Sequence, residues 1–297
     1  MGRFGFILFF IATTANAEQL CQNKVVIATI DTGIDLKNEY LVKFIKKDAV
    51  GNLVGENTIN KFDSIQDRNG HGTQMADIMT KISKCAELIP IIYWDETANP
   101  KLDSFVLAIE RAMTYKPNII NISGGGNVFS EREYSLLKET ESRGIIIVSA
   151  AGNDGKNTDF PPNRYFPGSY QLPNMITVSA VDSAGELGRF SNFGLNSVHI
   201  SAHGVDVSAS GLNNTTTISS GTSQATAYVS GVVANLLTVD KSLKGEAIKN
   251  IIIKTADKKS DLMGKSQSGG VINEARAIAS IKSKKFKKGN FPTYKKL

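Results

Sequence analysis

Short apolar runs rich in β-branched residues alternate along this chain with segments that carry a helical pattern of apolar residues. The runs are continuously apolar, which is typical of strands that are covered on both faces. Alternation of such strands with helices builds a mostly parallel sheet between two layers of helices, so the sequence predicts a three-layer α/β fold. The expected strands are residues 25–30, 88–93, 118–123, 145–150 and 175–181, and the expected helices are residues 72–83, 102–115, 130–142, 221–238 and 243–254.

The first residues, MGRFGFILFFIATTANA, have the pattern of a cleavable secretion signal over residues 1–17. One Arg precedes an apolar run from Phe4 to Ala12, and small residues stand at Ala15 and Ala17. The alternative is a membrane anchor, but the run is shorter than the roughly 20 residues that a spanning helix needs. We therefore expect a secreted protein, periplasmic or extracellular, with no membrane span.

The basic character of the chain lies at its end. Residues 282–297 contain seven Lys and no acidic residue, whereas the whole chain has a net charge of +6. Such a run is usually solvated and disordered, and the alternative is contact with an anionic surface. No nucleic-acid-binding motif lies beside it, so we expect no nucleic-acid partner. No linker interrupts residues 18–281, which we expect to form one domain.

The chain has two cysteines, Cys21 and Cys85. An even pair in an exported protein favours a disulfide, although two buried thiols are the alternative. Each cysteine lies just before an expected strand, so if residues 25–30 and 88–93 are parallel neighbours both cysteines lie at the same edge of the sheet. With three histidines at no ligand-like spacing, the sequence predicts no metal site and no cofactor.

Polar residues follow the expected strands at the sheet edge where α/β proteins bind ligands. Asp31 and Asn153 each follow a strand, His71 stands between two glycines at the start of a helix, and Ser223 precedes a long apolar helix. Each has an ordinary explanation, since Asp forms turns and Ser caps helices. Together they supply the carboxylate, imidazole, hydroxyl and amide donor of acyl-transfer catalysis.

The segments that carry these residues stand in the order VVIATIDTGID, NGHGTQMA, NIINISGGG, IIIVSAAGND and SSGTSQATAYVSGVVA. They resemble the successive signature blocks of the subtilisin-like serine proteases. The resemblance covers about residues 22–281 and ends with GGVINEARAIAS, which is similar to the closing segment of that family. It implies a three-layer subtilisin-like fold and a serine endopeptidase that acts on protein or peptide substrates.

The resemblance also implies a role for each of these residues. Ser223 would attack the scissile carbonyl and form an acyl-enzyme, while His71 would take the serine proton and pass it to the leaving amine. Asp31 would hold His71 in the required tautomer. The side-chain amide of Asn153 and the backbone N–H of Ser223 would stabilise the oxyanion.

Further matches concern the substrate. One segment is similar to the strand that pairs with an extended peptide, and another is similar to a wall of the pocket for the residue before the cleaved bond. An aromatic residue at the bottom of that pocket implies an uncharged, apolar or aromatic preference. These residues are Ser123, Gly124 and Gly125 for the strand, Ala150, Ala151 and Gly152 for the wall, and Tyr165 for the bottom.

The sequence departs from the family pattern at several places near these blocks. The changed positions are Gln74, Asp77, Gln224, Ala227 and Tyr228. Only Glu18 to Lys24 separate the expected signal from the first strand, so we expect a compact monomer without an N-terminal prodomain. The family's longer calcium-binding loop is also missing after the His71 helix, and we expect no strong calcium site of that kind.

Two other functions compete with a general secreted endopeptidase. A subtilisin-like binding protein without catalysis would be expected to have lost Asp31, His71 or Ser223, and none is lost. A maturation protease with a narrow peptide target would fit the small size of the chain. Peptide-library cleavage distinguishes broad from narrow specificity.

Overall fold

The structure is a computed structural model, and it describes residues 21, 24–94 and 102–289. Its centre is a nine-stranded sheet in the order β10-β11-β7-β6-β5-β4-β1-β3-β2. Neighbouring strands are parallel, except β10 and β11, which are antiparallel. The strands are β1 (Val25–Asp31), β2 (Glu56–Asn57), β3 (Ala86–Ile92), β4 (Ile119–Ile122), β5 (Ile146–Ala150), β6 (Met175–Val181), β7 (Ile200–His203), β10 (Asp257–Lys258) and β11 (Gly270–Val271).

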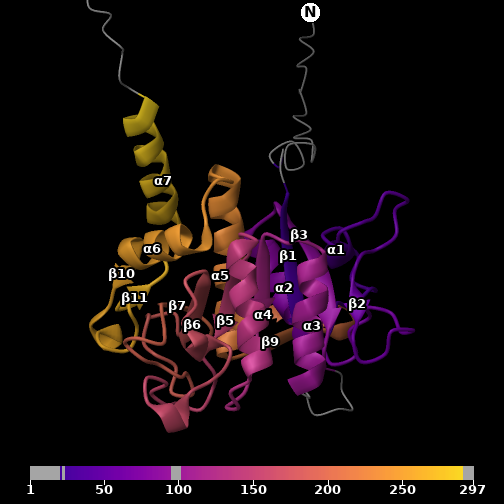
Figure 1. Cartoon of the computed structure of the whole chain (residues 1–297), viewed down its shortest axis with the longest axis horizontal. Helices are drawn as coiled ribbons and strands as arrows, with labels where there is room; N and C mark the ends of the chain where they lie inside the picture. Colours follow the sequence, from indigo (N-terminus) through magenta and orange to yellow (C-terminus); the bar gives the residue numbers. More distant parts are fainter. Residues whose placement is uncertain (1–20, 22–23, 95–101, 290–297) are drawn as a thin grey trace, which may run out of the picture.

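Helices cover both faces of this sheet, as Figure 1 shows. Two helices, α3 (Leu102–Thr114) and α4 (Glu131–Ser142), pack on one face. The other face carries α2 (His71–Ile82), α5 (Thr222–Val239), α6 (Gly245–Thr255) and α7 (Glu274–Gly289). A short helix, α1 (Glu39–Val42), and a hairpin of β8 (Val207–Ser210) and β9 (Thr216–Ser219) complete the fold. The expected three-layer α/β architecture is confirmed.

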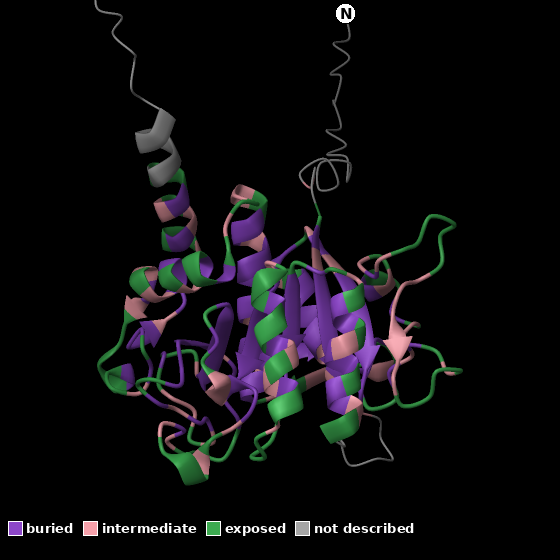
Figure 2. Ribbon diagram, viewed as in Figure 1, coloured by how far each residue is buried: buried purple, intermediate pink, exposed green. Residues whose placement is uncertain are grey.

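Strand β1 illustrates why the expected strands are continuously apolar. Val25 and Ile27 pack with α2 and α5, whereas Ala28 and Ile30 pack with α3 on the opposite face. All four side chains are buried, and Figure 2 shows the strands buried between the two helix layers. Because neither face meets water, the strand does not alternate regularly between apolar and exposed polar residues.

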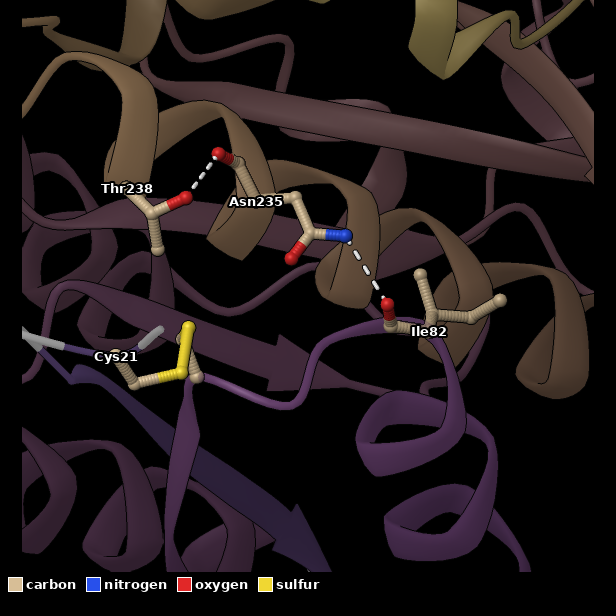
Figure 3. Close-up of a disulfide and its surroundings, with 5 residues drawn as sticks. Cys21, Ile82, Asn235 and Thr238 are labelled. Carbon is tan, nitrogen blue, oxygen red and sulfur yellow. Dashed lines mark hydrogen bonds between the residues drawn. A yellow bond between two sulfur atoms is a disulfide. The ribbon is translucent and has the colours of Figure 1, made fainter. Parts of the chain in front are cut away.

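The two cysteines form a disulfide, as the sequence predicts. Cys21 and Cys85 are bonded, and the backbone N–H of Val25 donates to the carbonyl of Cys85 at 2.9 Å. β1 and β3 are parallel neighbours, so the bridge joins the amino ends of two adjacent strands. Figure 3 shows that the disulfide lies near Asn235 of α5, whose amide donates to the carbonyl of Ile82 at the end of α2. The disulfide therefore joins two strands here, and the Asn235 hydrogen bond joins two helices beside them.

The predicted elements agree with the structure to within two residues at their ends. The sequence prediction missed β7, where His199 lies just before the strand and Ser201 interrupts its apolar residues. These polar side chains are buried with partners, since the N–H of Thr177 donates to His199 Nδ1 at 2.9 Å and the Ser201 hydroxyl lies 2.8 Å from that of Ser179. Paired polar groups of this kind are compatible with a central strand.

The structure describes only the first part of the basic tail. Disorder was expected over residues 282–297, whereas α7 continues to Gly289 and extends away from the sheet (Figure 1). Lysine is a good helix former, and this helix begins on the core through the buried Ala277 and Ile281. The expected signal at residues 1–17 and the last tail residues lie outside the described residues. In the part that is described, no helix is long and apolar enough to cross a membrane.

Candidate active site

Asp31 and His71 meet at the carboxyl end of β1. Their side chains join at 2.7 Å, between Asp31 Oδ1 and His71 Nδ1. The backbone N–H of Thr32 donates to the same carboxylate oxygen at 2.8 Å. Asp31 is 3% exposed, whereas the His71 side chain is 25% exposed. A buried carboxylate thus orients a ring whose other nitrogen is left for chemistry.

Glycine allows the His71 helix to come this close to β1. A Cβ at Gly72 would lie 2.2 Å from the carbonyl oxygen of Gly33, so no other residue fits there. The N–H of Gly72 donates to the hydroxyl of Thr32 at 2.8 Å. Gly70, which precedes the helix, has a φ of 101°, a conformation that glycine adopts without strain. The glycines that flank His71 therefore set its distance from Asp31.

The charge of Asp31 governs the basicity of His71. Burial alone would lower the pKa of His71. The charge of Asp31, its hydrogen bond and the charge of Asp67 outweigh burial and raise the pKa above its ordinary 6.5. His71 is therefore a stronger base than a free imidazole and is neutral only above this raised pKa.

Ser223 lies in the first turn of α5, on the far side of the sheet from α3, and is 8% exposed. Its hydroxyl donates to the backbone carbonyl of Ser123 at 2.6 Å rather than to His71. The Ser123 hydroxyl donates in turn to the carbonyl of Ser223 at 3.3 Å. The serine is thus near the expected substrate strand, in a rotamer that must turn before its proton can pass to an imidazole.

Asn153 is held by the start of the same helix. Its side-chain Oδ1 accepts from both the backbone N–H and the hydroxyl of Thr222, each at 2.9 Å. The Thr222 hydroxyl also accepts from the N–H of Gly152 at 3.2 Å. Because Oδ1 is used in this way, the Nδ2 donor of Asn153 is the end of the amide left for a ligand.

The sequence analysis did not single out Thr222, which has no unusual chemistry of its own.

The expected substrate residues lie together around one aromatic ring. A Cβ at Gly125 would lie 2.8 Å from Tyr165 Cε1, and one at Gly152 would lie 2.8 Å from Tyr165 Cδ2. The ring of Tyr165 therefore lies between the Gly125 segment and Gly152, the last residue of the expected wall. On the other side, a Cβ at Gly124 would lie 2.4 Å from the Tyr93 hydroxyl. The role of these residues in binding substrate stays a prediction.

Two departures from the family pattern contact a common partner. The Ser219 hydroxyl donates to Gln74 Oε1 at 2.7 Å and accepts from Gln224 Nε2 at 2.7 Å. This connects α2, which carries His71, to α5, which carries Ser223. Asp77 is buried and ion-paired with Lys81, and it accepts from the N–H of Ser210 in the β8–β9 hairpin.

Among the residues that the structure describes, no group of three or more His, Cys, Asp or Glu side chains could hold a metal ion. The expectation that calcium does not stabilise this chain remains a prediction.

The chain is also similar to known proteins. The sequence model of the subtilase family matches residues 22–273. The chain belongs to the subtilase family. The match ends somewhat before residue 281, where the resemblance was expected to end.

Curated relatives of this subtilase include the cell wall-associated protease of Bacillus subtilis strain 168, at 30% identity over 259 residues. The thermostable alkaline protease of Halalkalibacterium halodurans is 29% identical over 259 residues. Each match covers 84% of this chain, but only 27% of the first relative and 67% of the second. Among solved structures, one from the assembly of subtilase cytotoxin SubAB has a TM-score of 0.75 and 25% identity, over 93% of this chain and 97% of its own.

Proposed function

We propose that this subtilase is a secreted serine endopeptidase in which Asp31, His71 and Ser223 form the catalytic triad. The observation that carries the proposal is the 2.7 Å contact between Asp31 and His71, at the sheet edge where Asn153 and Ser223 also lie. Family membership and the protease relatives support the same reaction. The disulfide and the N-terminal signal pattern support secretion.

In the proposed reaction, the Ser223 oxygen attacks the carbonyl carbon of the substrate and its proton moves to His71 Nε2. Asp31 stabilises the resulting imidazolium through Nδ1. The carbonyl oxygen becomes an oxyanion that Asn153 Nδ2 and the N–H of Ser223 stabilise, aided by the positive end of α5. His71 then protonates the leaving amine, and water hydrolyses the acyl-enzyme by the same steps in reverse.

Substrate binding has a direct means of freeing the nucleophile. The Ser223 hydroxyl donates to the carbonyl of Ser123, which is also the first acceptor of the expected substrate strand. A substrate N–H that pairs with this carbonyl competes with the hydroxyl. Once displaced, the hydroxyl rotates toward His71, so the strand that positions the substrate also releases the serine.

The test is labelling of the secreted protein by a fluorophosphonate, which reacts with an activated serine. We expect the wild type to be labelled once, at Ser223, and Ser223→Ala to be unlabelled although folded. Ser220, an exposed serine of the same segment, supplies the control variant Ser220→Ala, which should be labelled like the wild type. Absence of labelling in folded wild-type protein refutes the proposal and favours a binding protein.

A further inference from the structure

A cavity of about 170 Å³ lies beside the glycine run that follows β4. Gly125 and Gly126 form one side, and the rings of Tyr93, Phe105 and Phe166 form its walls, with Glu133 of α4 also lining it. We call it the Glu133 cavity. A dry cavity of about 150 Å³ holds one benzene molecule, so this one has room for one long side chain.

Glu133, one of the residues that line this cavity, has a carboxyl oxygen without a hydrogen-bond partner. Glu133 is 2% exposed, and its Oε1 is buried without a partner. Buried polar groups are almost always paired, because an unpaired one costs on the order of 1–3 kcal/mol of stability. We infer that this unpaired acceptor, on a residue that borders a cavity, is the partner of a donor group of a ligand.

The ordinary explanation for this glutamate is a capping box. Ser130 caps α4 and accepts from the N–H of Glu133 at 3.2 Å, and in a capping box the glutamate would accept from the N–H of Ser130. Here that N–H donates to the hydroxyl of Tyr170, at 3.2 Å. Tyr170 thus takes the place of the carboxylate in the cap and is itself hydrogen-bonded to the Glu133 carboxyl group, but Oε1 stays unpaired.

The cavity lies at the same edge of the sheet as the candidate active site. Tyr93, one of its walls, donates its backbone N–H to the carbonyl of Asp31 at 3.2 Å. Gly125 and Gly126 are two and three residues beyond Ser123, whose carbonyl accepts from Ser223. At about 3.3 Å per residue of extended chain, a peptide alongside this segment reaches the cavity with a residue three or four positions before the cleaved bond.

We propose that the Glu133 cavity binds a lysine or arginine side chain of the peptide substrate, with the Glu133 carboxylate as the partner of the cation. The proposal rests on the proposed peptidase function and names a specificity of that site. The aromatic walls contact the aliphatic part of such a side chain and attract its cation. Two apolar residues that line the cavity, Leu102 and Val128, are 41% and 69% exposed, as expected where a peptide enters.

The ionisation of Glu133 gives this proposal a pH signature. Burial raises the pKa of Glu133 to about 7, although a hydrogen bond from Tyr170 acts in the opposite direction. The carboxylate therefore forms as pH rises through about 7, and the preference for a cation rises with it. Burial raises the pKa values of the Tyr93 and Tyr170 phenols above 10, so both stay neutral in this range. On α4 itself, Arg132 is exposed and paired with Glu110 of α3, and Glu131 is exposed.

The first test uses wild-type enzyme and quenched peptides that differ only by lysine, norleucine or glutamate, placed in turn at the second to fifth positions before the cleaved bond. At one position we expect kcat/KM for lysine to exceed that for norleucine by about tenfold or more, because a buried charge-assisted hydrogen bond is gained. The ratio should rise between about pH 6 and pH 8. Both peptides depend equally on His71, so its titration cancels. Equal rates at every position and pH overturn the proposal.

The second test uses Glu133→Gln, which keeps the shape of the side chain, with Glu131→Gln as a control that removes the same charge from the same turn. We expect Glu133→Gln to abolish the lysine preference and its pH dependence, so that lysine and norleucine peptides have equal kcat/KM. Glu131→Gln should keep both. A lysine preference that survives in Glu133→Gln overturns the assignment. If wild-type protein neither labels at Ser223 nor cleaves any peptide, the proposed function itself has failed, which is a different outcome.

Discussion

Replacing Thr222 by valine removes one hydroxyl beside the proposed oxyanion site and keeps the shape of the side chain. That hydroxyl donates to Asn153 Oδ1 at 2.9 Å and accepts from the N–H of Gly152 at 3.2 Å. The second hydrogen bond to Asn153, from the Thr222 backbone N–H, survives the change. The variant therefore loosens the Asn153 amide without releasing it.

The magnitudes follow from this count of hydrogen bonds. The N–H of Gly152 is left buried without a partner, so the free energy of unfolding should fall by about 1–3 kcal/mol. Loss of a whole oxyanion donor costs about 10²- to 10³-fold in kcat. With one of two holding bonds retained, we expect kcat to fall about tenfold. KM should change little, since the amide contacts the oxyanion only in the transition state.

Peptide cleavage kinetics and urea denaturation measure both effects, and Thr222→Ser, which retains the hydroxyl, is the matched control. Asn153→Leu should lower kcat by about 10²- to 10³-fold. In the Asn153→Leu background, Thr222→Val should lower kcat no further, because its effect on catalysis passes through the Asn153 amide. If the two losses multiply instead, Thr222 does not act by orienting Asn153 and the reasoning is wrong.

Two further predictions concern the triad and the disulfide. Asp31→Asn should lower kcat by about 10⁴-fold, because an amide does not hold the required tautomer of His71. Activity needs neutral His71, so kcat/KM of the wild type should fall as pH drops through the raised pKa of His71. Asp31 is one cause of that raised pKa, so in Asp31→Asn the fall should move to lower pH. An unchanged pH profile contradicts this. The double variant Cys21→Ser, Cys85→Ser opens a loop with a sequence separation of 64, which should lower the free energy of unfolding by about 4 kcal/mol and leave kcat unchanged. Urea denaturation checks it, and a loss below about 1 kcal/mol would show that the bridge does not restrict the unfolded chain.

Much of the sheet was predictable because strands buried on both faces have a simple signature. β1, β3, β4, β5 and β6 consist mainly of apolar, often β-branched residues, and each was expected within two residues of its observed ends. β7 was not predicted, because Ser201 and the nearby His199 are polar. Both are buried with hydrogen-bond partners on β6. Such partners are contributed by a distant part of the chain, so local composition does not indicate them.

The polar residues of the candidate site were also visible in the sequence, since Asp31, His71, Asn153 and Ser223 stand at the ends of expected strands or the starts of expected helices. Their chemical types and order along the chain come from local patterns. The distances between them, such as the 2.7 Å contact of His71 with Asp31, depend on the close approach that Gly72 permits.

The sequence by itself determined the fold class and the types of residue at the site. It also favoured a disulfide between the two cysteines over two buried thiols. Only the tertiary structure decided that Thr222 holds Asn153, that Gln74 and Gln224 meet at Ser219, and that Glu133 lines a cavity and has an unpaired oxygen. The physical reason is the same in each case. Burial and hydrogen-bond partners are properties of segments far apart in the chain, and a glutamate three residues after Ser130 has the same local pattern whether it caps a helix or lines a cavity.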